Sequence, residues 1–138
     1  MLLYVTVGTN NLDRAIEFYD PVLRTLGYER LFTNHDEAGY ASQRDIRCRF
    51  WVVYPFDKQE ASVGNGSMTA LLAPDRPAVR AFHAAALLYG GTDEGPPGIR
   101  PFHENFYGSY VRDPDGNKLS AVCEAPDSAD DSRSAKVT

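Results

Sequence analysis

The chain has 138 residues and a net charge of −5, and 43% of its residues are hydrophobic and 24% charged. This length is typical of one domain, and the composition argues against a disordered, collagen-like or coiled-coil protein. We expect neither a membrane nor a nucleic-acid partner, because no apolar run approaches the roughly 20 residues of a spanning helix and no basic stripe is present.

The first half of the chain predicts a strand, a helix and three further strands. Leu2–Val7 is rich in β-branched and aromatic residues, as strands are. Asn10 and Asn11 supply a helix N-cap, and apolar residues then recur at helical spacing until Gly27. Asp20-Pro21 predicts either a kink in this helix or the start of a second short helix. The three strands that follow are expected at Tyr28–Thr33, Tyr40–Gln43 and Cys48–Tyr54.

The second half predicts a similar order. Ser67–Leu72 is expected to be a strand, and Pro74-Asp75-Arg76-Pro77 begins a helix that ends at Gly90-Gly91. The apolar stripe of this helix is expected to be Val79, Phe82, Ala86 and Leu87. Gly95-Pro96-Pro97-Gly98 is expected to be a loop, because glycine and proline disfavour regular structure.

The C-terminal part predicts a hairpin followed by a tail. Phe106–Val111 and Lys118–Cys123 are the strands, and Asp113-Pro114-Asp115-Gly116 has the residue order of a type I turn. From Ala125 onward the chain is mostly Asp, Ser and Ala, which predicts a disordered tail over residues 126–138.

An internal repeat relates the two halves. A shift of 64 residues superposes the two strand–helix units, placing Val7 on Leu71, Ala15 on Val79, Phe18 on Phe82, Leu23 on Leu87 and Gly27 on Gly91. The order that repeats is βαβββ. Few folds are built from two such units.

Two motifs then indicate a family. The segments Val7–Tyr19 and Tyr110–Lys118 resemble the opening and the closing hairpin of the vicinal oxygen chelate superfamily. That superfamily includes glyoxalase I, bleomycin and fosfomycin resistance proteins and extradiol dioxygenases. The resemblance covers about residues 2–124. It implies an α+β glyoxalase/bleomycin resistance fold, with βαβββ modules at about residues 1–63 and 64–125, in which paired, curled mixed sheets form an open cup. It also implies a homodimer with ligand sites in the cups.

The resemblance also locates the places where a divalent metal is usually held by His or Glu. They fall on Tyr4, Met68 and Ser120, with the fourth near Trp51 or Val53. None of these side chains is a good ligand for zinc, nickel, manganese or iron. We therefore predict no metal and no cofactor, with a divalent metal as the alternative.

Ligand-binding candidates follow from the same positions and from the aromatic residues of the expected cup strands. They are Tyr4, Trp51, Met68, His103, Tyr107 and Ser120. Further aromatic candidates are Tyr54, Phe106 and Tyr110, and Arg49 or Arg112 could orient a ligand. Of the other histidines, His35 is expected to be solvated and His83 to have a surface or helix-packing role. No nucleophile–base pair or phosphate loop is recognisable, so the catalytic residues remain unknown.

The leading hypothesis is a metal-free, glyoxalase-like protein of the bleomycin-resistance type that binds a small aromatic or cationic molecule. The alternative is a lyase, isomerase or dioxygenase of the same superfamily, with metal ligands such as His103 or Glu104. A third possibility is a dimerising module whose cup is filled by its own side chains. Cys48 and Cys123 are expected to be free thiols in a reducing cytoplasm.

Overall fold

Two βαβββ modules make up the protein, in a computed structural model that describes residues 1–127. The first module contains β1 (Val5–Gly8), α1 (Leu12–Arg24), β2 (Tyr28–Thr33), β3 (Glu37–Ser42) and β4 (Phe50–Val53). The second contains β5 (Thr69–Leu72), α2 (Arg76–Leu88), β6 (Thr92–Ile99), β7 (Tyr107–Arg112) and β8 (Lys118–Cys123). The predicted repeat is confirmed, since a shift of 64 residues carries the bounds of β1 and α1 onto those of β5 and α2.

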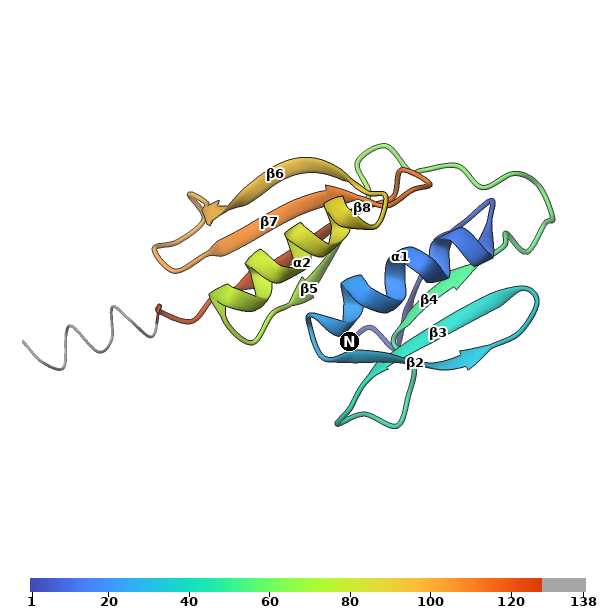
Figure 1. The fold of residues 1–138 in the computed structure, drawn as a ribbon, viewed down its shortest axis with the longest axis horizontal. Coiled ribbons are helices and arrows are strands. Elements are labelled where there is room, and N and C mark those ends of the chain that lie inside the picture. Colours follow the sequence, from blue (N-terminus) through green and yellow to red (C-terminus); the bar gives the residue numbers. More distant parts are fainter. Residues whose placement is uncertain (128–138) are drawn as a thin grey trace, which may run out of the picture.

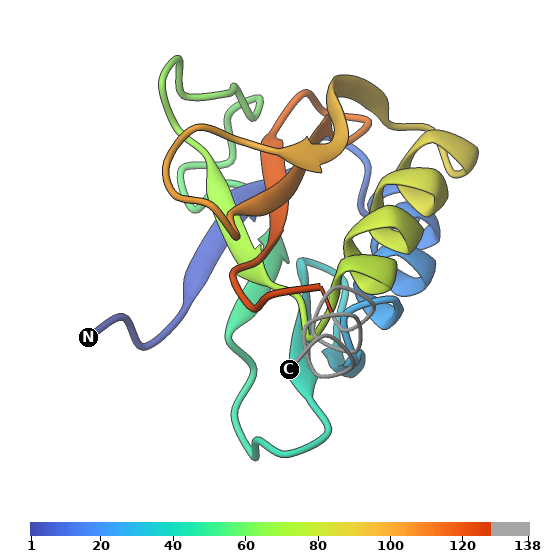
Figure 2. The same cartoon turned by 90° about the vertical axis from the view of Figure 1, so that its left-hand side faces the viewer.

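Each module forms a four-stranded mixed sheet. The strand orders are β1-β4-β3-β2 and β5-β8-β7-β6, and in each sheet only the first pair of strands is parallel. The helices α1 and α2 lie side by side in front of the two sheets in Figure 1, and in the turned view they occupy one side of the molecule (Figure 2). The predicted α+β fold is confirmed. One face of each sheet packs against a helix, and the opposite face does not.

The helices begin at the residues that the sequence predicted. The Asn11 side chain accepts a hydrogen bond from the Arg14 amide at α1, and Asp75 caps α2 in the same way through the Ala78 amide. Such caps satisfy amides that have no partner within the helix. Asp20-Pro21 does not divide α1, which continues to Arg24 with Pro21 inside it.

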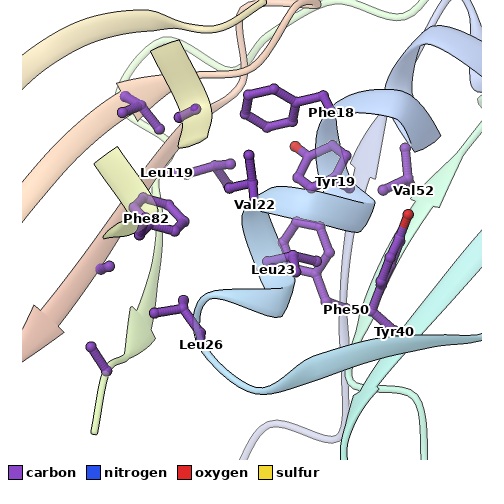
Figure 3. Packing of buried hydrophobic residues seen from close by; sticks show 14 of the residues in the cluster. Phe18, Tyr19, Val22, Leu23, Leu26, Tyr40, Phe50, Val52, Phe82 and Leu119 are labelled. Carbon is purple, nitrogen blue, oxygen red and sulfur yellow. The ribbon is translucent and has the colours of Figure 1, made fainter. Parts of the chain in front are cut away.

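The hydrophobic core joins the two modules. Phe18 and Val22 of α1 and Phe82 of α2 are completely buried, and so is Leu119 of β8. Figure 3 shows Phe82 and Leu119 pointing toward the side chains of α1. The aromatic rings of Phe18 and Tyr19 meet edge to face with centroids 4.9 Å apart. Burial of these rings from both modules stabilises the docking of one module on the other.

Three sequence expectations need correction. The first strand begins at Val5, and Leu2 and Leu3 are exposed. Gly95-Pro96-Pro97-Gly98 is not a separate loop but lies within β6, where register shifts let the chain pass the two prolines on an edge strand. Leu87 is 43% exposed although its counterpart Leu23 is fully buried, so it does not belong to the buried stripe of α2.

The predicted tail over 126–138 lies, from residue 128 on, outside the described residues. Over residues 1–127, no helix is long and apolar enough to cross a membrane.

Candidate functional site

The open face of the first sheet holds a cavity of about 670 Å³, which we term the first cavity. Trp51 and Val53 point into it because their neighbours Phe50 and Val52 alternate toward the core. The complete lining is Tyr4, Thr6, Leu31, Phe32, Glu37, Ile46, Arg47, Cys48, Trp51 and Val53. It is mostly apolar and aromatic, as small-molecule sites usually are.

Trp51 forms the floor of the first cavity because Gly39 lies beneath its ring. A Cβ built on Gly39 would lie 2.8 Å from Cη2 and Cζ3 of Trp51 and 2.9 Å from Sγ of Cys48. Only glycine at position 39 leaves room for the Trp51 ring, because any larger side chain would collide with it. Phe32 of β2 meets the indole edge to face, with centroids 5.7 Å apart. Trp51 is thus the floor of the first cavity, and Phe32 is an aromatic wall beside it.

The open face of the second sheet holds another cavity, of about 490 Å³, which we term the second cavity. Tyr110 and Ser120 are register partners on β7 and β8, and both line it. The complete lining is Met68, Ala70, Phe102, Phe106, Tyr110, Lys118, Ser120 and Val122.

A smaller, more polar cavity of about 220 Å³ connects these two. It shares Thr6 with the first cavity and Met68 and Lys118 with the second. Its other lining residues include the segment Ser62–Gly64 and Asn117. The concave surface therefore runs across both modules, with an aromatic cavity at each end and a polar section between them.

Four of the six predicted ligand-binding residues line these cavities. Tyr4 and Trp51 lie in the first cavity, and Met68 and Ser120 lie in the second. His103 lines neither; its Nε2 lies 2.8 Å from Oε2 of Glu124, and its ring packs edge to face against a phenylalanine of the second cavity.

Tyr107 does not face a cavity, and its expected orientation toward the cup is wrong. Its ring packs against the core under the guanidinium groups of Arg76 and Arg80 of α2, which lie 5.1 and 5.9 Å from its centroid. The reason is strand alternation, since its neighbours Phe106 and Gly108 take the other face of β7 and Phe106 lines the second cavity.

Three further candidates have structural partners instead. The Tyr54 hydroxyl accepts a hydrogen bond from the amide of Leu12 at the start of α1. Arg49 pairs with Asp45, and Arg112 pairs with Glu94. Periodicity alone could not reveal these contacts, because they depend on the positions of loops and on the pairing of β6 with β7. Other cavity residues were not predicted as ligand contacts, among them Phe32, Glu37, Arg47, Phe102 and Lys118.

The donor set at the expected metal positions does not fit a divalent metal. Tyr4 and Trp51 lie in one cavity, and Met68 and Ser120 in another. A phenol, an indole, a thioether and a hydroxyl are poor ligands for zinc, nickel, manganese or iron(II). Within residues 1–127, no three His, Cys, Asp or Glu side chains are grouped so that they could hold an ion. We therefore derive no metal-dependent step for this chain, and the metal-free state stays a prediction.

The two family motifs contact each other across the modules. Asp115, in the β7–β8 turn, accepts hydrogen bonds from the Thr9 hydroxyl at 2.6 Å and the Asn10 amide at 3.0 Å, and it pairs with Arg14 at 2.8 Å. Asn117 donates to the carbonyl oxygen of Gly8. We call this contact the module clasp. Its residues join the first module to the last hairpin, so these motif residues have a structural role here.

A buried pair continues the module clasp into the core. The Tyr19 hydroxyl donates to Oδ2 of Asp113. Burial raises the pKa of Tyr19 well above its ordinary value, and the neighbouring carboxylate raises it further. Burial also raises the pKa of Asp113, against hydrogen bonds from Tyr19 and Asn117 that lower it. The phenol therefore keeps its proton at neutral pH and serves as the donor.

Comparison with known proteins agrees with this geometry. No family model and no curated protein matches the chain. Among solved structures, a glyoxalase/bleomycin resistance protein from Albidiferax ferrireducens T118 is 38% identical, with a TM-score of 0.79 over 88% of this chain and 97% of that one.

More distant structures share the fold alone. A glyoxalase-related enzyme from Fulvimarina pelagi is 18% identical, with a TM-score of 0.69 over 89% of this chain and 87% of that one. A lactoylglutathione lyase from Agrobacterium tumefaciens is 18% identical, with a TM-score of 0.63 over 89% and 92%. With the repeat, the sheet topology and the first of these likenesses together, the chain belongs to the glyoxalase/bleomycin resistance protein/dioxygenase superfamily.

Proposed function

We propose that the protein binds a small organic molecule in its concave surface and needs no metal to do so. The observation that supports this most directly is the first cavity, whose floor is Trp51 lying over Gly39. Its volume of about 670 Å³ lies within the range of ordinary ligand sites. An aromatic floor and wall favour a ligand with a ring or a cationic group.

The chain offers a direct spectroscopic test of this proposal. Trp51 is its only tryptophan, so intrinsic fluorescence reports on the first cavity without interference from other indoles. We propose titration with three probes of equal shape, 3-phenylpropanol, 3-phenylpropionate and 3-phenylpropylamine, excited at 295 nm. Saturable quenching or a shift in the emission maximum is expected for at least one probe.

A matched pair of variants identifies the binding surface. Phe32→Ala removes the wall that meets Trp51 and should weaken the binding of that probe about tenfold, because an aromatic contact of this kind and its buried area are lost. Phe56→Ala is the control, since Phe56 is fully exposed and lines none of the three cavities. Equal affinity in both variants would contradict binding at the first cavity.

The metal-free part of the proposal has its own test. Purified protein incubated with manganese, nickel, zinc or iron(II) and then desalted is expected to retain far less than one ion per chain. Stoichiometric metal, or turnover of the hemithioacetal of methylglyoxal and glutathione, would favour the alternative of a superfamily lyase, isomerase or dioxygenase.

We also propose a homodimer in the cytoplasm, as the superfamily resemblance implies. Exposed apolar side chains near the cavities, such as Leu31, Ile46 and Phe102, support an assembly that covers part of this surface. Both cysteines are free, which agrees with a reducing compartment. Sedimentation equilibrium is expected to give twice the chain mass of 15.3 kDa, and a monomer at micromolar concentration would contradict the dimer.

A further inference from the structure

We propose that the second cavity binds an aromatic acid, with the carboxylate between Lys118 and Ser120 and the ring against Phe102, Phe106 and Tyr110. This inference rests on the proposed function and adds the chemical class of ligand for one part of the concave surface. Three features of the second cavity support it: an unpartnered hydroxyl, an unpaired ammonium and an aromatic rim.

The hydroxyl of Ser120 is the first feature. Ser120 is completely buried, and strand alternation turns it to the open face of β8 because Leu119 and Ala121 pack in the core. Its Oγ has no hydrogen-bond partner among residues 1–127. Buried hydroxyls nearly always have a partner, so this one is an exception that a bound ligand explains.

The ammonium of Lys118 is the second feature. Lys118 is half-buried at the start of β8, and its Nζ lies 5.7 Å from the ring centroid of Tyr110. In the described part of the chain it makes no salt bridge or hydrogen bond. The guanidinium of Arg100 lies 5.3 Å from the same centroid. Two cations thus adjoin one ring.

Within residues 1–127, no acidic residue lines the second cavity, and this favours a ligand of negative charge. Lys118 is the only charged residue among the eight that line the second cavity. The carboxylate of Glu124, just after β8, is already paired with His103. By contrast, the first cavity has both Glu37 and Arg47 in its lining, so its charge is mixed. The second cavity therefore favours an anion.

The aromatic rim is the third feature and selects a ring. Phe102 and Phe106 meet edge to face with centroids 4.8 Å apart. Phe102 is 70% exposed, so its ring can close over a ligand without unpacking the core. A carboxylate that pairs with an ammonium and accepts from a hydroxyl forms charge-assisted hydrogen bonds, and the ring buries apolar area against the rim.

The test compares the same three probes by calorimetry, with backbone amide shifts of ¹⁵N-labelled protein locating each one. We expect 3-phenylpropionate to bind tightest and to shift the amides of Leu119, Ser120 and Ala121. Lys118→Gln should weaken its binding roughly tenfold and leave 3-phenylpropanol within about twofold, because only the charge pairing is lost. Lys58→Gln is the control, since it removes the same charge from a lysine that is 70% exposed and lines neither aromatic cavity.

Ser120→Ala separates a ligand-binding role from a structural one. The variant should weaken binding of 3-phenylpropionate several-fold while the melting temperature stays the same or rises, because the buried hydroxyl has no hydrogen-bond partner to lose within residues 1–127. A lower melting temperature with unchanged binding would show a structural role and overturn the assignment of Ser120.

The other outcomes distinguish this inference from the function it rests on. If amide shifts place 3-phenylpropanol or 3-phenylpropylamine in the second cavity with the affinity of the acid, or if Lys118→Gln has no effect, the aromatic acid is wrong while a small-molecule site remains. If none of the probes changes Trp51 fluorescence or any amide shift, both proposals are contradicted.

Discussion

Replacement of Gly39 by alanine is expected to lift Trp51 from the floor of the first cavity. The added Cβ would lie 2.8 Å from two indole carbons, whereas carbon atoms in contact are about 3.5–4.0 Å apart. The ring must therefore move by roughly 0.7–1 Å, or the strand must bend. Sγ of Cys48 would lie 2.9 Å from the same Cβ, so the Cys48 side chain must also move.

The magnitude follows from the cost of overpacking. One extra methyl group in a packed site destabilises a protein by about 1–3 kcal/mol. For a chain of this size, each kcal/mol lowers the melting temperature by roughly 3–4 °C, so a fall of about 3–12 °C is expected. Trp51 is only half-buried and can move outward, which favours the lower end of that range. Probe binding in the first cavity should weaken at the same time, because the floor rises.

The assay has a matched control in the other module. Gly108 is a buried strand glycine like Gly39, but a Cβ on it would have its nearest contact, Val122, at an ordinary 3.5 Å. Gly108→Ala should change the melting temperature by no more than about 2 °C and leave the Trp51 emission spectrum unchanged. If Gly39→Ala keeps both the wild-type melting temperature and the wild-type Trp51 emission, the arrangement of Trp51 over Gly39 is wrong.

Three further predictions concern the core and the module clasp. Asp115→Ala should lower the free energy of unfolding by roughly 2–3 kcal/mol in urea denaturation, because its partners lose a charged acceptor; a loss below 0.5 kcal/mol would contradict the clasp. Leu23→Ala should lower the free energy of unfolding by about 2–5 kcal/mol, and the equivalent Leu87→Ala by less than about 1 kcal/mol, because Leu23 is buried and Leu87 is exposed. Equal losses would contradict this difference in burial. The folded-state pKa of Tyr19 is raised, so its contribution to the free energy of unfolding is fully present below pH 10. That contribution is lost as the pH rises further, by up to about 1.4 kcal/mol per pH unit. Circular dichroism melts from pH 8 to 12 should show this fall, and Tyr19→Phe should reduce it.

The order of elements could be predicted from sequence because local rules determine it. The caps at Asn11 and Asp75, the apolar spacing of α1 and the glycines after the helices each act within a few residues. The hairpin turn also follows from local residues, and the amide of Gly116 donates to the carbonyl of Asp113 as expected. The repeat then assigned the same structure to both halves.

Local rules failed where a neighbouring element decides the outcome. Gly95–Gly98 pairs within β6 because register shifts on an edge strand tolerate two prolines. Leu87 has the spacing of a buried residue and is nevertheless exposed, although the repeat places it on the buried Leu23. Tyr107 is an aromatic residue on a strand, as expected for the cup. Side chains alternate between the two faces of β7, however, and Tyr107 falls on the face that packs against α2.

The sequence by itself determined the two βαβββ modules and the family motifs, because these depend on residue type and spacing. The family resemblance then located the expected metal positions, where Tyr4, Met68 and Ser120 are poor ligands. Only the tertiary structure showed that the motifs form a clasp between modules, that Gly39 lets Trp51 form a floor and that Ser120, which lines the same cavity as Lys118, is buried with no hydrogen-bond partner among residues 1–127. These are contacts between residues up to about a hundred positions apart, such as Thr9 and Asp115. Strand register and module docking bring them together, and neither is encoded in any short segment.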